Sequence, residues 1–116
     1  MTDAAQMTKF DAVAVGRRVL TAEADALRLQ ADTLGEAFEK AVDLLFAAKG
    51  RVICTGIGKS GHVAKKIAAT FASTGAPAFF VHANEASHGD LGMIAEGDVI
   101  LALSKSGQNQ ELADVI

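Results

Sequence analysis

Residues 51–62, RVICTGIGKSGH, decide the fold of this chain. The β-branched apolar run at 51–55 predicts a strand, and the three glycines that follow it predict a tight loop. From Ser60 to Ser73, apolar residues recur at helical spacing, at Val63, Ile67 and Phe71. An apolar strand that passes through a glycine-rich loop into a helix is typical of an α/β protein.

Two further strands and the start of another helix follow the same order. Ala78–His82 comes after Gly75 and Pro77, and Val99–Leu103 comes after a turn at Gly97–Asp98. Residues 104–109 open the next helix, and the chain stops about two turns into it. Strands that are apolar throughout and separated by helices or long crossovers indicate a doubly wound parallel sheet with helices on both faces. We expect residues 51–116 to be the first half of such a unit, and therefore an incomplete domain.

Two helices are predicted before this unit, within residues 8–48. From Thr8 to Asp32 an apolar residue recurs every seven positions, at Val13, Leu20 and Leu27, and Leu34 falls beyond the helix end. Such a stripe predicts an amphipathic helix and could also be a subunit interface. Thr33 and Glu36 have the spacing of a capping box for a second helix over residues 35–48.

Composition excludes several classes of function. The chain has 116 residues, 50% of them hydrophobic, and a net charge of −3, so we expect no basic face for a nucleic-acid partner. Its longest apolar run, Leu44 to Ala48, is far too short to cross a bilayer, and its N-terminus lacks the pattern of a secretion signal. The single cysteine, Cys54, lies in an apolar run. We expect a cytoplasmic protein with a buried structural cysteine.

The first glycine-rich loop fits two nucleotide motifs poorly. Its GxGxxG pattern would suit a dinucleotide site, but the acidic residue expected about 20 positions later is missing from the end of the next strand. A P-loop fails because Ile53 stands where its first glycine belongs. What remains is a loop whose backbone N–H groups favour an anion, with Lys59 in its middle. The alternative for Lys59 is an ordinary solvated cation. We expect no cofactor.

A second loop of the same kind follows the third predicted strand. Ser104 and Ser106 can donate to phosphate oxygens, although such residues also make ordinary N-caps. Two such loops at the carboxyl ends of parallel strands indicate a shared crevice. In the segment between the second and third strands, His88 stands near Asp90 and could transfer protons, or could simply bond the backbone. The histidines do not have metal-ligand spacing, so no metal site is predicted.

Three segments together carry a resemblance to a known family: TGIGKSGHVAKKIAATFASTG at 55–75, HANEASHGDLGMI at 82–94 and SKSGQNQE at 104–111. They resemble arabinose 5-phosphate isomerases, which are SIS (sugar isomerase) domain enzymes of bacterial lipopolysaccharide or capsule sugar synthesis. The resemblance implies an SIS-type, flavodoxin-like sheet and interconversion of arabinose 5-phosphate and ribulose 5-phosphate. It also implies a small-molecule sugar phosphate as partner and a homotetramer. Family members often add CBS domains, and none is present in this sequence.

The resemblance also assigns candidate site residues. Lys59, His88 and Glu111 match catalytic positions: Glu111 as the base at carbon, His88 for ring opening or proton transfer at oxygen, and Lys59 to steady negative charge. The positions implied for substrate and phosphate binding are Gly58, Ser60, Ser104, Ser106 and Asn109. Gln108-Asn109 departs from the Ser or Thr usual in the second loop, which puts the phosphate contact at Asn109 in question. An alternative is a non-catalytic SIS module that binds sugar phosphates.

Overall fold

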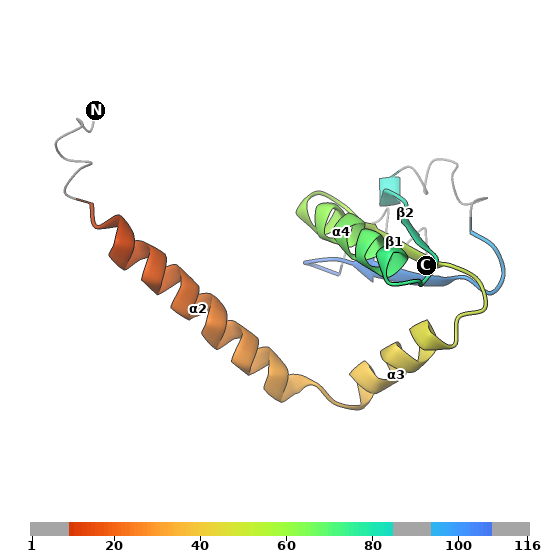
Figure 1. The fold of residues 1–116 in the computed structure, drawn as a ribbon, viewed down its shortest axis with the longest axis horizontal. Helices are drawn as coiled ribbons and strands as arrows, with labels where there is room; N and C mark the ends of the chain where they lie inside the picture. The colour runs from red at the N-terminus through yellow and green to blue at the C-terminus, as the bar shows by residue number, and fades with distance from the viewer. Residues whose placement is uncertain (1–9, 85–93, 108–116) are drawn as a thin grey trace. The chain divides into compact units, whose positions relative to one another are not determined.

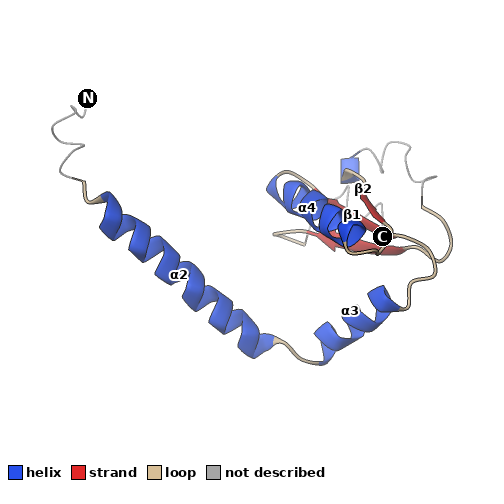
Figure 2. Cartoon of the chain, in the orientation of Figure 1, coloured by secondary structure: helices blue, strands red, loops and turns tan. Residues whose placement is uncertain are grey.

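A computed structural model describes residues 10–84 and 94–107 (Figure 1). Within these residues the helices are α2 (Ala12–Thr33), α3 (Glu36–Phe46) and α4 (Lys59–Ser73), and the strands are β1 (Val52–Gly56), β2 (Ala78–Phe80) and β3 (Val99–Leu103) (Figure 2). The chain divides into two compact units, residues 1–39 and 40–116. The helix predicted after Ser104 falls largely on 108–116, outside the described residues.

The strands form the predicted parallel sheet, in the order β2-β1-β3. In the register, Cys54 of β1 pairs with Phe80 of β2, and Gly56 of β1 pairs with Leu103 of β3. The central strand is completely buried, as expected for a strand with neighbours on both sides. The expected α/β fold with a parallel sheet is therefore confirmed.

Alternate residues of β1 face two separate apolar clusters. Val52 and Cys54 pack with Ala64 and Ala68 of α4, which lies over one face of the sheet (Figure 1). The alanines let the helix approach the strand closely. Cys54 is buried, as expected, and burial raises the pKa of its thiol.

Ile53 points to the opposite face of the sheet and joins Val81 in the second cluster. Partly buried side chains of Phe79, Ile94 and Ile100 complete this cluster. Helices were predicted on both faces. In the described part of the chain only the Val52 and Cys54 face carries a helix.

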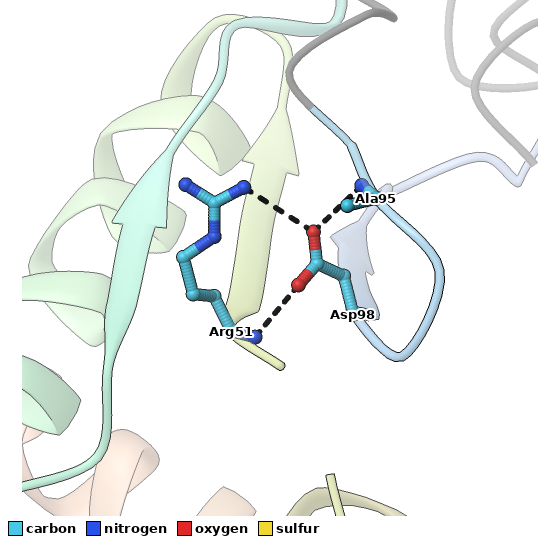
Figure 3. Close-up of polar contacts among 3 residues, drawn as sticks. All are labelled: Arg51, Ala95 and Asp98. Carbon is cyan, nitrogen blue, oxygen red and sulfur yellow. Dashed lines mark hydrogen bonds and ion pairs between the residues drawn. The ribbon is translucent and has the colours of Figure 1, made fainter. Parts of the chain in front are cut away.

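A buried carboxylate joins the amino ends of β1 and β3 (Figure 3). Asp98, whose side chain is 2% exposed, accepts from the backbone N–H of Arg51 at 2.7 Å and from that of Ala95 at 2.8 Å. The Arg51 guanidinium lies 3.4 Å from the carboxylate and stacks on the Phe79 ring, 4.5 Å from its centroid. The two N–H bonds, and then the guanidinium charge, lower the pKa of Asp98. Gly50 is needed beside this carboxylate, because a Cβ there would overlap Asp98 Oδ1.

Helix α2 begins and ends with identifiable caps. Asp11 accepts from the N–H of Ala14 at 2.9 Å, and the N–H of Leu34 donates to the carbonyl of Ala31 beyond the last turn. Leu34 therefore lies past the helix end, as predicted. No residue of α2 is buried. No described helix is both long and apolar enough to span a bilayer.

The predicted capping box is wrong. Thr33 is the last residue of α2, and its hydroxyl donates to the carbonyl of Gln30 at 2.7 Å. The same oxygen accepts from Gln30 Nε2 at 3.1 Å, so both printed bonds of the Thr33 side chain stay within α2, and α3 begins only at Glu36. Because a threonine side chain can bond within its own helix, spacing alone was a poor guide.

Candidate functional site

The two glycine-rich loops begin side by side. Gly56 and Leu103 end their strands and are partners in the register, so residues 57–58 and 104–107 leave the same edge of the sheet. The β1–α4–β2 connection leads to one side of β1, whereas β3 lies on the other side. This reversal of strand order makes the β1/β3 edge a topological switch point, where α/β sheets bind ligands. The expected juxtaposition of the two loops is present.

The amino end of α4 presents unpaired N–H groups. Gly58 is its N-cap, with φ 59° and ψ −130°, a conformation that only glycine adopts readily, and it offers no side chain to bond the helix. The N–H groups of Gly61 and His62 bond the carbonyls of Ile57 and Gly58. Those of Lys59 and Ser60 have no acceptor among the described residues, and the Lys59 side chain adds a positive charge at the same turn. This end of the helix therefore favours an anion.

A contact between two glycines sets α4 against β1. A Cβ at Gly56 would lie 2.9 Å from the N atom of Gly61 and from the carbonyl of Ser60, and a Cβ at Gly61 would lie 2.9 Å from the oxygen of Gly56. Backbone meets backbone here, at the point where the strand ends and the helix starts. Sequence reasoning used Gly61 only as part of a rejected nucleotide motif and missed this contact. The third glycine of GxGxxG, which serves close helix packing in dinucleotide folds, was the available signal.

The loop after β3 is a turn held by its own serine. Ser104 Oγ accepts from the N–H of Gly107 at 2.8 Å, and Gly107 has a positive φ of 71°. This bond is the cap-like alternative considered for Ser104. Residues 104–107 are exposed, Ser106 and Lys105 included. The loop therefore places two serines and one lysine at the same edge of the sheet as Lys59.

The end of β2 differs from the prediction. The strand stops at Phe80 rather than His82, because His82 Nδ1 makes a local bond, accepting from the N–H of Asn84 at 3.1 Å. The His82 ring stands edge-on to Phe80, 6.3 Å between centroids. Residues 81–84 carry no acid that could serve a dinucleotide ribose. No cluster of metal-ligating side chains is found among the residues that the structure describes.

The candidate residues divide into two groups. Those in the described residues are gathered at the β1/β3 edge: Gly58, Lys59, Ser60, Ser104 and Ser106. His88, Glu111 and Asn109 lie outside the described residues. The roles given to all of them remain predictions.

Comparison with known proteins identifies the family. The model of the SIS domain family matches residues 44–116, so the chain belongs to the SIS domain family. Its curated relatives include the arabinose 5-phosphate isomerase KdsD of Pseudomonas aeruginosa, 53% identical over 92% of this chain. The protein of that name from Escherichia coli K12 is 46% identical, also over 92%. The chain spans 33% of the length of each of these relatives.

A solved structure supports the same assignment. E. coli CFT073 c3406 in complex with A5P matches with a TM-score of 0.81 and 38% sequence identity, over 91% of this chain and 58% of that chain. The SIS fold expected from the resemblance is thereby confirmed for the part that the chain covers.

Proposed function

We propose that this chain forms the sugar-phosphate-binding part of an isomerase that interconverts arabinose 5-phosphate and ribulose 5-phosphate. The observation that carries the proposal is the pairing of Gly56 with Leu103, which brings both glycine-rich loops to one sheet edge. The names of the relatives, and the A5P bound to the structural neighbour, support the choice of substrate.

The proposed reaction proceeds through an enediol and requires no redox partner. A base removes the proton from C2 of the open-chain aldose while O1 is protonated, which gives the enediol. The proton on O2 then leaves as C1 is protonated, and the product is the ketose. By resemblance, Glu111 is the carbon base, and His88 assists ring opening or proton transfer at oxygen. Both groups suit general acid–base work.

Lys59 is proposed to stabilise the negative charge that develops on the oxygens. It is exposed and stands at the first position of α4, beside N–H groups that have no acceptor among the described residues. The amino end of the helix dipole and the ammonium group are both positive, so both favour an oxyanion or a phosphate. Ser60, Ser104 and Ser106 are proposed to hold the phosphate with hydroxyl and backbone donors.

The test is turnover by the 116-residue chain and its Lys59→Met variant. Arabinose 5-phosphate is supplied, and ketose formation and binding heat are measured. We expect the variant to lose roughly 10²-fold in kcat/KM, the scale found when one charge-stabilising donor is removed. Lys65→Met is the matched control, because Lys65 is an exposed lysine of the same helix, six positions along. It should behave as the wild type.

Two outcomes would count against the proposal. Binding without turnover would favour the non-catalytic sugar-phosphate-binding module. Absence of both binding and turnover would overturn the sugar-phosphate assignment for this chain. Assembly as a homotetramer and a place in lipopolysaccharide sugar synthesis are proposed with the isomerase function, on the resemblance alone. A cytoplasmic location is proposed from the single buried cysteine.

A further inference from the structure

We propose that Gly61 is a positioning residue, which fixes Lys59 and Ser60 by letting the first turn of α4 rest on the backbone of β1. The effect of Gly61 on substrate binding rests on the proposed function, whereas its effect on the position of α4 does not. Gly61 is buried, although it neighbours an exposed loop. Its role differs from that of Gly58, whose backbone conformation itself requires glycine.

The dihedral angles of Gly61 do not explain its identity. Gly61 lies inside α4, and its φ is not positive. Glycine weakens a helix interior relative to alanine, so on helix propensity alone alanine would be the better residue here. The close contact with the backbone of Gly56 is therefore the reason that position 61 holds glycine.

Atoms of β1 and β2 leave little room for a Cβ at position 61. A Cβ at position 61 would stand 2.9 Å from the carbonyl oxygen and 3.2 Å from the carbonyl carbon of Gly56, both main-chain atoms of the central strand. The Phe80 ring of β2 would lie 3.7 Å from the same Cβ. No side-chain rotamer can relieve an overlap with main chain in a fully buried strand. A methyl group at position 61 would be accommodated by movement of the first turn of α4 away from the sheet.

Movement of that turn would displace the charge-bearing groups of the site. Lys59 and Ser60 belong to the same turn, one and two residues before Gly61. Ordinary van der Waals contact begins near 3.4 Å, so the 2.9 Å approach calls for a shift of about 0.5 Å. Because misplacement by 1 Å can cost about 10²-fold in rate, a shift of half that size should cost roughly 10-fold.

The experiment compares Gly61→Ala with Gly16→Ala in the 116-residue chain. Both glycines are inside helices, but a Cβ at Gly16 meets nothing within 4 Å. Amide ¹H–¹⁵N spectra report the geometry, and titration with arabinose 5-phosphate reports the site. For Gly61→Ala we expect shifts of the Gly58, Lys59 and Ser60 amides and a roughly 10-fold loss of kcat/KM, or of affinity if the chain binds without turnover. Gly16→Ala should leave both unchanged.

Gly56→Ala places a methyl group in the same contact from the strand side. This variant replaces Gly61→Ala in the experiment if Gly61→Ala does not fold. The double variant should lose less than the two single losses combined, because the first methyl has already displaced the helix. Unchanged amides at residues 58–60, or full additivity, would overturn the positioning role. Failure of the wild type to bind arabinose 5-phosphate would refute the proposed function instead, and the amide spectra would still decide the role of Gly61.

Discussion

Replacement of Thr55 by valine should stabilise the protein. Thr55 is 0% exposed, and its Oγ1 has no hydrogen-bond partner among the described residues. Burying an unpaired hydroxyl costs about 1–3 kcal/mol, and valine has nearly the same shape. We expect Thr55→Val to raise the free energy of unfolding by about 1 kcal/mol, and Tm by roughly 4 °C or more.

Thr55→Ser separates the hydroxyl from the methyl group at the same position. Serine keeps the unpaired hydroxyl and removes a buried methyl, which should cost about 1 kcal/mol. Urea unfolding followed by circular dichroism, with equal m-values for the three proteins, provides the measurement. The order of stability should be valine, threonine, serine.

A loss of stability in Thr55→Val would refute this reasoning, because it would mean that the hydroxyl has a partner in the folded protein. The affinity for arabinose 5-phosphate offers a second check. Thr55 is completely enclosed and precedes the end of β1, so a ligand at the sheet edge should bind the valine variant as well as the wild type. A marked loss of affinity would place Thr55 in the site.

Two further changes probe the two ends of the sheet. At the amino end, the pKa of Asp98 is lowered in the folded protein, so its stabilising effect is complete above the unfolded carboxyl pKa, near 4, and is lost as the pH falls through the folded value. Asp98→Asn should therefore flatten the acid limb of stability against pH in urea melts, and an unaltered acid limb would contradict this. At the site end, Gly58→Ala should cost about 1–3 kcal/mol through its φ of 59° and weaken sugar-phosphate binding. Calorimetry that finds wild-type stability and affinity would show that this backbone conformation is not required.

Much of the fold follows from short-range patterns. The apolar run at 51–55 and the glycines after it predicted β1 and the start of α4, and β3 has the predicted bounds, Val99–Leu103. β2 ended earlier than predicted, because His82 bonds the backbone of Asn84, and the capping box failed, because Thr33 bonds back to Gln30. Both errors involve polar side chains that choose among several nearby backbone partners, a choice that spacing does not encode.

The sequence by itself determined which residue types stand at the carboxyl ends of the strands, and hence the prediction of an anion site there. Tertiary structure decided which of those ends meet. The pairing of β1 with β3 brings the loop that holds Lys59 beside the loop that holds Ser104, and the Gly56–Gly61 contact shows how closely α4 approaches β1. The physical reason is that strand order and helix approach depend on contacts between residues far apart in the chain, whereas hydrophobic period and turn chemistry are local.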